Sequence, residues 1–194
     1  KVYAFGDVDD VAITNITPSK TIVGQGYNMS INVTVENQGS YPETNINVTA
    51  YANDITIQTL TISSLARSEK ATVTFTWNTT GFAKGNYTIK AVADTVQGET
   101  DTLDNTLIDG KVLVGVPCDI TGPENPPGSG KYPPDGVCNM RDIGYMCAHF
   151  MTTPSSSNWD PNCDVTGRDW GMPDGVVNMR DIGEACGNFM KSDP

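Results

Sequence analysis

The sequence predicts a mainly β chain that ends in a small α-helical module. Two observations carry this prediction. Residues 10–115 alternate between apolar and polar side chains, with turn residues between the runs, as half-buried strands do. Farther along, the stretch Asp135–Gly144 returns as Asp174–Gly183 and differs only where Cys138 is replaced by Val177. Such a duplication, with its regularly spaced acidic residues, indicates a repeated calcium-binding loop.

The composition narrows the classes of function. The 194 residues carry a formal net charge of −11, with a pI near 4.3. A nucleic acid requires a basic protein face, so we expect no nucleic-acid partner. We also expect no membrane span, because no apolar run approaches the roughly 20 residues that a spanning helix needs. Asn-x-Ser/Thr sequons and several cysteines favour an exported, mature protein.

We expect the first part of the chain to be a β-sandwich of immunoglobulin type, because about seven short antiparallel strands fall within roughly 105 residues. The expected strands cover residues 11–16, 27–37, 44–52, 55–63, 70–78, 85–93 and 106–115. Their inward faces would supply the core: Ile31, Val33, Val35, Ile46, Val48, Val73, Phe75, Trp77, Tyr87 and Ile89. The cysteines all follow residue 116 and the sequons all precede it, so we place a domain boundary at Pro117.

The sequons lie at Asn15, Asn28, Asn32, Asn47, Asn78 and Asn86. All except Asn15, whose phase is ambiguous, fall on the polar face of an expected strand. A glycan at these positions would point into solvent, so we expect several of them to be glycosylated. A β-domain rich in Thr and Asn could also contain sequons by chance.

Several motifs follow one another in the order found in one family of surface domains: Asp10–Lys20, Gly24–Tyr27, Val33–Gly39, Phe75–Gly81, Gly85–Thr88, Gly98–Asp101 and Asp104–Asn105. With them, residues 10–116 resemble the CARDB family, the cell-adhesion-related, immunoglobulin-like domain of archaeal and bacterial surface proteins. The resemblance implies a sandwich with a non-catalytic, extracellular role at the cell surface. The acidic loop Glu99, Asp101 and Asp104 could be a solvated turn or a cation site.

Residues 1–9 precede this domain and contain a short apolar, β-prone segment, Lys1–Phe5. The segment could pack on its own domain as an extra strand. Alternatively, residues 1–6 could be donated as a strand to the sheet of a neighbouring copy, since an extended peptide can pair with an open sheet edge.

In residues 117–194 the acidic spacing fits two calcium loops, because calcium prefers oxygen ligands at alternate positions with a glycine at the bend. The expected ligands of the first Ca²⁺ are Asp119, Asp135, the carbonyl of Val137, Asn139 and Asp142. Those of the second Ca²⁺ are Asp164, Asp174, the carbonyl of Val176, Asn178 and Asp181. Each loop leads into an amphipathic helix, and the two helices should pack together with pseudo-twofold symmetry.

This part of the chain resembles a dockerin, the duplicated F-hand module of secreted assemblies. The resemblance implies a cohesin-like partner. The candidate partner-binding residues occupy the helix starts at which dockerins carry recognition residues: Met140, Arg141, Met179 and Arg180. They could equally be exposed without binding a partner.

One departure from the dockerin pattern concerns the first half of each loop. Residues 122–134 and 167–173 are inserted there, and threonine takes the third ligand position in both copies. A carbonyl of the insertion or Asp169 could complete a site. If no metal binds, Asp142 and Asp181 would act as helix caps.

The five cysteines repeat with the loops. The residue before the first ligand and the residue five after the last are expected to face one small core, which predicts the disulfides Cys118–Cys147 and Cys163–Cys186. Cys138 is then unpaired and buried, and a bridge from Cys138 to Cys147 is the main alternative. A zinc site is not expected, since no Cys-x-x-Cys motif or histidine partner accompanies these residues.

No catalytic constellation is recognisable, so we expect no enzyme. His149, the only histidine, lies off the apolar phase of its helix and is expected at the surface. Two functions remain. The first is a glycosylated, calcium-stabilised structural or adhesion protein whose copies join into a cell-surface filament or layer. The second is an accessory adaptor that docks to a cohesin-like partner. The short connection between the last strand and Cys118 favours the first, because dockerin adaptors usually hang on long tethers.

Overall fold

The computed structural model describes residues 8–192, and the segment proposed for strand donation, residues 1–6, lies outside them. Contacts divide the described chain into two compact units. The first unit comprises the chain up to Pro18, Ser30–Trp77 and Thr88–Lys111, and the second comprises Ser19–Met29, Asn78–Tyr87 and the chain from Val112 onward. The C-terminal part therefore shares a unit with two segments of the expected sandwich, a division that the composition break at Pro117 does not show.

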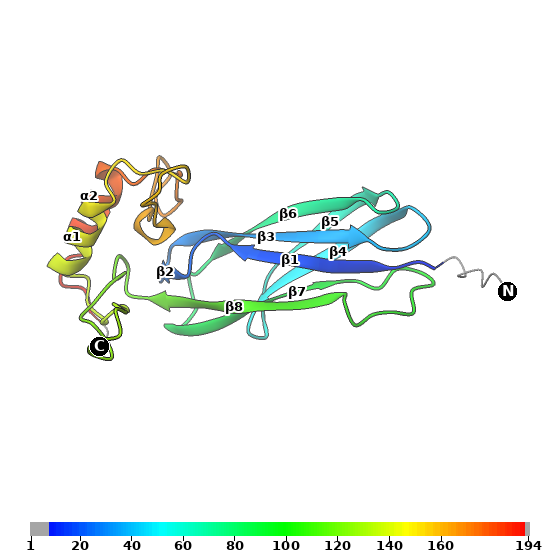
Figure 1. Ribbon diagram of the computed structural model, residues 1–194, viewed down its shortest axis with the longest axis horizontal. Coiled ribbons are helices and arrows are strands. Elements are labelled where there is room, and N and C mark those ends of the chain that lie inside the picture. The colour runs from blue at the N-terminus through cyan, green and yellow to red at the C-terminus, as the bar shows by residue number, and fades with distance from the viewer. Residues whose placement is uncertain (1–7, 193–194) are drawn as a thin grey trace. The chain divides into compact units, whose positions relative to one another are not determined.

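The described residues contain eight strands in two sheets, which form a β-sandwich (Figure 1). The smaller sheet has the order β1 (Val11–Pro18), β3 (Asn28–Asn37) and β6 (Lys70–Asn78). The larger sheet has the order β2 (Ile22–Gly24), β8 (Thr106–Gly115), β7 (Gly85–Ala93), β4 (Glu43–Ala52) and β5 (Ile55–Leu65).

Seven of these strands match the strands expected from the sequence. The alternation that predicted them is the alternation of burial: in β3 every second residue from Met29 to Val35 is buried. Phe75 and Trp77 of β6 are fully buried, and burying side chains of this size stabilises the core by about 1.5–3 kcal/mol each. Of the ten predicted core residues only Val73 is not buried; it is half-buried.

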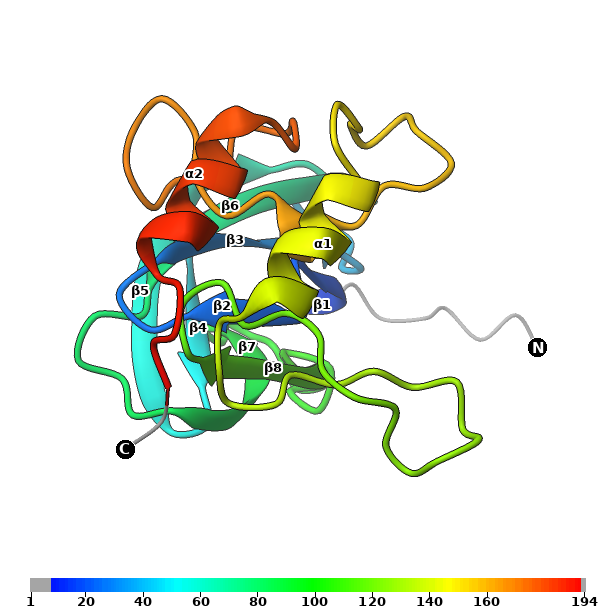
Figure 2. The ribbon, with the colours of Figure 1, turned by 90° about the vertical axis from the view of Figure 1, so that its left-hand side faces the viewer.

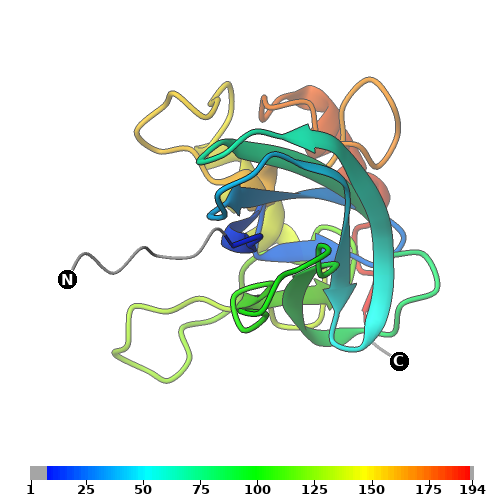
Figure 3. The ribbon, with the colours of Figure 1, turned by 90° about the vertical axis from the view of Figure 1, so that its right-hand side faces the viewer.

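The missed strand is β2, which pairs in parallel with the end of β8, Ile22 opposite Leu113. Three residues are too few to show a recognisable alternation of apolar and polar side chains. In the first unit, β4 and β5 form a long antiparallel hairpin, drawn in cyan in Figure 3. Its two residues between the strands are Asn53 and Asp54, and Asn53 has a φ of 54°, a conformation that asparagine tolerates well.

The C-terminal part contains two helices, α1 (Met140–Ala148) and α2 (Met179–Gly187), which pack side by side (Figure 2). A short 3₁₀ helix, η1 (Pro161–Cys163), precedes the second loop. Among the described residues, no helix is long and apolar enough to cross a membrane.

Reciprocal backbone hydrogen bonds relate the two loop-helix repeats by the expected pseudo-twofold symmetry. The amide of Cys138 donates to the carbonyl of Lys191 at 3.0 Å, and the amide of Met190 donates back to Cys138 at 2.8 Å. In the other half, Val177 exchanges the same pair of bonds with Met151 and Thr152, at 2.7 and 3.1 Å. The residue in the middle of each loop thus binds the segment that follows the other helix.

The second unit contains a direct attachment between the segment Ser19–Met29 and the C-terminal repeats. The Lys20 ammonium is buried and donates to the carbonyl of Asp164 at 2.6 Å. The side-chain oxygen of Asn162 accepts the amides of Thr21 and Ile22 at 3.1 and 3.0 Å. The C-terminal repeats are therefore held by hydrogen bonds to a segment that lies about 140 residues earlier in the chain.

Candidate functional site

The first aspartate of each loop closes the loop by accepting backbone amides. The Asp119 carboxylate accepts the amides of Asp135 and Gly136 at 3.1 and 2.7 Å. The second copy repeats this geometry, with Asp164 accepting Asp174 and Gly175 at 3.2 and 2.8 Å. The inserted residues therefore loop out while Asp119 and Asp164 still reach the second half of their loops.

The last aspartate of each loop is fully buried and has three backbone partners. Asp142 accepts the amides of Ile120, Thr121 and Asn139 at 2.9, 3.0 and 2.8 Å. The bond to Asn139 completes a capping box at the start of α1, and Asp181 makes the equivalent bonds at the start of α2. This is the capping role that the sequence left open as the alternative to metal ligation.

In the first loop, several predicted ligand oxygens surround the amide nitrogen of Asn139. That nitrogen lies 3.4 Å from both carboxylate oxygens of Asp135 and 3.0 Å from the carbonyl of Val137. In the second loop the Asn178 nitrogen lies 2.9 Å from the carbonyl of Val176. Calcium takes carboxylate and carbonyl oxygens, so these oxygens fit the ion chemically. In the structure the asparagine side-chain nitrogen lies among them and donates hydrogen bonds to them.

The first aspartates of the two loops, Asp119 and Asp164, differ in the charges that surround them. Burial raises the pKa of Asp119 to about 6, against the effect of the Gly136 and Asp135 amides. Burial also raises the pKa of Asp164, but there the Lys20 ammonium acts in the opposite direction. Burial lowers the pKa of Lys20 to about 8, partly offset by the negative charges of Asp164 and Asp181.

Two glycines that the sequence argument missed belong to this site. A Cβ on Gly122 would lie 2.4 Å from the carbonyl of Pro133, and one on Gly167 would lie 2.8 Å from the carbonyl of Met172. The repeated spacing Asp-x-Thr-Gly, which starts at Asp119 and at Asp164, would have pointed to them. The threonines at the third position bind the insertions: the Thr121 hydroxyl donates to Tyr132, and the Thr166 hydroxyl accepts the amide of Gly171.

The predicted cysteine pairing is not made, because all five cysteines are free thiols in the structure. Cys118, Cys138 and Cys163 are all buried in the core of the repeats. Cys147 and Cys186 are exposed, so they cannot meet these partners. The expectation was wrong by one helix position: Met146 and Ala185 face the core, and the next residue is turned about 100° away.

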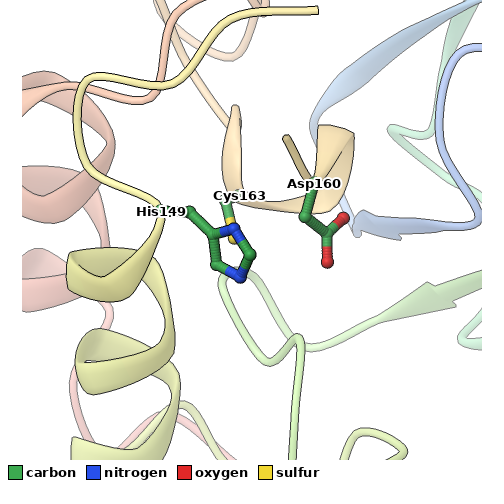
Figure 4. A group of neighbouring side chains, drawn as sticks. All are labelled: His149, Asp160 and Cys163. Carbon is green, nitrogen blue, oxygen red and sulfur yellow. The ribbon is translucent and has the colours of Figure 1, made fainter. Parts of the chain in front are cut away.

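The structure brings together a group that the sequence argument did not connect: His149, Asp160 and Cys163 (Figure 4). One possible ligand atom of each lies within 4.8 Å of the others, and this is the one such group of three His, Cys, Asp or Glu side chains found in residues 8–192. His149 is half-buried here instead of lying free at the surface. Its ring packs at a tilt of 49° against the ring of Tyr145, with the centroids 4.6 Å apart.

The candidate partner-binding residues are exposed and occupy matching places in the two repeats. Met140 and Met179 are each 65% exposed. Arg141 and Arg180 are exposed as well, and each guanidinium lies 3.7 Å from the carboxylate of its loop, Asp135 or Asp174.

None of the sequon asparagines is buried. Asn15, Asn32, Asn78 and Asn86 are exposed, and Asn28 and Asn47 are half-buried. The side chain of Asn47 is engaged on both sides, since it donates to Asp94 and accepts from Thr61. The exposed four are the sterically simpler candidates for a glycan.

The acidic loop of the first unit is partly structural. Glu99 accepts the amide of Val11 at 2.8 Å and the side-chain nitrogen of Asn105 at 3.1 Å. Beside it, one side-chain oxygen each of Asp10, Asp104 and Asn105 is buried without a hydrogen-bond partner in the described part of the chain. Burial and repulsion between the carboxylates raise the pKa values of Asp10 and Asp104.

Comparison with known proteins identifies the first part of the chain. The family model described as CARDB matches residues 8–107. A CARDB domain from Pyrococcus furiosus, solved in complex with di-metal ions, is 27% identical, covers 55% of this chain and 89% of its own, and has a TM-score of 0.47. A domain of a candidate cell surface protein from Methanosarcina acetivorans is 29% identical, with coverages of 56% and 92% and a TM-score of 0.45. No curated protein matches the chain.

A methyl group added at a tightly packed loop glycine and one added at an open helix glycine should change the free energy of unfolding in opposite directions. Gly167→Ala should lower the free energy of unfolding by about 1–3 kcal/mol, because its Cβ would lie 2.5 Å from the Cβ of Asp174. Gly183→Ala, inside α2 with nothing within 4 Å, should raise it by about 0.5–1 kcal/mol. Urea unfolding of both variants measures the difference, and equal midpoints would contradict the packed loop.

Asp10 and Asp104, each with one buried carboxylate oxygen that has no hydrogen-bond partner among the described residues, predict a pH-dependent loss of folding stability. Because the folded-state pKa values of Asp10 and Asp104 lie above the unfolded values, protonation favours the folded state, and stability falls as pH rises above about 4. In chelator, Asp104→Asn should therefore raise the melting temperature at pH 7 by a few degrees and leave it unchanged at pH 3.

The matched control for this charge is Asp54→Asn, whose carboxylate is fully solvent-exposed in the β4–β5 turn and makes only a long surface ion pair with Lys90, at 3.9 Å, of a kind that contributes little to stability. It should not change the melting temperature at either pH. A destabilised Asp104→Asn protein at pH 7 in chelator would show that this carboxylate is favourable as it stands.

Proposed function

The chain belongs to the CARDB family, and on that premise we propose that it is a non-catalytic, glycosylated extracellular protein of structural or adhesive function. Calcium stabilises its dockerin-like C-terminal repeats, and its copies assemble into a cell-surface filament or layer. The family match covers the first part of the chain, and the repeated loops supply the rest of the proposal.

The observation that carries the proposal is the attachment of the C-terminal repeats to the segment Ser19–Met29. Lys20 and the amides of Thr21 and Ile22 bind the residues around η1. The side-chain nitrogen of Asn188, at the end of α2, lies 3.1 Å from the Tyr27 hydroxyl. A recognition module on a flexible tether would lack such bonds, whereas a building block that bears load benefits from them.

Calcium would act on the carboxylates of the loops. In the first loop Asp119, Asp135 and the carbonyl of Val137 would hold the ion, with Asn139 at its side. Asp164, Asp174, Val176 and Asn178 would do so in the second. The ion supplies positive charge at buried carboxylates, so it stabilises the folded loops in the way that protonation of Asp119 does without metal.

The exposure of the sequons supports glycosylation, and the contacts of the loop carboxylates support a non-catalytic role. Four sequon asparagines are exposed on strands or at their ends, where a glycan would extend into solvent. The repeated carboxylates that could have served catalysis instead accept backbone amides that close the loops.

A second candidate is an adaptor that docks to a cohesin-like partner, and the exposed apolar residues of the repeats favour it. They occur as matched pairs at equivalent positions, with closely similar exposure: Met140 and Met179, Phe150 and Phe189, and Met151 and Met190. Two equivalent surfaces of this kind would allow one partner to bind in two orientations.

The experiment is electron microscopy of the purified full chain in calcium and in chelator. Ordered polymers that come apart on chelation are expected. An Asp119→Asn, Asp164→Asn protein should fail to polymerise and should lose the calcium-dependent rise in melting temperature, while Asp54→Asn should behave as wild type. Monomers that stay monomeric in calcium and capture a purified cohesin domain would overturn the structural role in favour of the adaptor.

A further inference from the structure

The group formed by His149, Asp160 and Cys163 has the composition of a transition-metal site. His149 caps the C-terminal end of α1, Asp160 caps the start of η1, and Cys163 ends η1. Cys163 is fully buried, and the other two are half-buried (Figure 4). A nitrogen, a carboxylate oxygen and a sulfur thus surround one point at the edge of the core.

We propose that these three side chains bind a zinc ion. Zinc takes imidazole nitrogen, carboxylate oxygen and thiolate sulfur at about 2.0–2.3 Å, so tetrahedral neighbours lie roughly 3.3–3.8 Å apart. The ligand atoms here lie within 4.8 Å of one another, so side-chain rotations close the remaining gap. A thiolate and a carboxylate balance the two charges of the ion, and a water molecule takes the fourth position.

Neighbouring groups already orient two of the three ligands. The Tyr145 hydroxyl donates to Asp160 Oδ2 at 2.9 Å, and Asp160 Oδ1 accepts the amide of Asn162 at 2.9 Å. The Nδ1 atom of His149 contacts the carbonyl of Asn158. Such outer partners fix the ring and the carboxylate, which is how metal-binding imidazoles are usually held.

The pseudo-symmetry provides an internal comparison. The position equivalent to His149 is Asn188, whose nitrogen lies 3.7 Å from the sulfur of Cys118, the equivalent of Cys163. The equivalent place beside Cys118 therefore has the cysteine, but Asn188 stands in the position of His149 and Gly115 in that of Asp160. One zinc ion per chain follows.

This site is distinct in chemistry from the proposed calcium loops, which offer only oxygen. Sulfur and nitrogen ligands select zinc over calcium, so saturating calcium should not displace the ion. The zinc proposal does not depend on calcium binding or on assembly.

The test is a titration of the full chain, stripped with chelator and kept in reductant and excess calcium chloride, with zinc chloride by calorimetry. One zinc per chain is expected. Cobalt chloride should give the near-ultraviolet absorption of thiolate-bound cobalt. His149→Gln and Asp160→Asn should weaken zinc binding at least about tenfold, as loss of supporting groups alone commonly does.

Cys186→Ser, which changes an exposed cysteine, is the control and should bind zinc and cobalt as wild type does. Cys163→Ser should lose the cobalt absorption. If that variant does not fold, His149→Gln decides the question, because its side chain is only half-buried. Unchanged zinc affinity in His149→Gln, or a cobalt complex without thiolate absorption, would overturn the site.

Discussion

The C-terminal repeats of this protein depend on a buried ammonium group. Lys20 is only 5% exposed, and its charge is stabilised by the carbonyl of Asp164 and by the nearby carboxylates of Asp164 and Asp181. A buried lysine without such partners would be strongly unfavourable, so folding of the second loop and placement of the segment Ser19–Met29 are coupled. Asn162 adds to this coupling by accepting the next two amides.

This coupling makes the two halves of a nearly symmetric module unequal. Burial raises the pKa of both Asp119 and Asp164, but only Asp164 has an ammonium group, that of Lys20, acting in the opposite direction. The same inequality appears in the ends of the helices. His149 after α1 meets Asp160 and Cys163, while Asn188 after α2 meets Cys118 and Tyr27. The duplication thus supplied one frame, and the two copies have acquired different contacts within it.

The sequence predicted the strands well because half-buried strands carry their burial as a visible alternation, as from Met29 to Val35 in β3. The repeat itself is visible in the sequence, but the two glycines Gly122 and Gly167, which pack against the second half of each loop, were overlooked. The sequence did not predict β2, which is too short to show a period, or the cysteine partners. The pairing failed because a shift of one residue on a helix decides whether Met146 or Cys147 faces inward. The His149 group could not be anticipated, since its members meet only through tertiary packing.

Hydrogen exchange at Thr21 and Ile22 tests the central claim most directly, because Asn162 is the acceptor for both amides. In the wild-type chain these amides should be protected. In Asn162→Ala, exchange should rise in residues 19–29 and, because the segment and the repeats are coupled, in residues 179–187 of α2 as well, while residues 31–36 of β3 keep their protection. Unchanged exchange in residues 19–29 would contradict the account and leave the repeats folding independently of that segment.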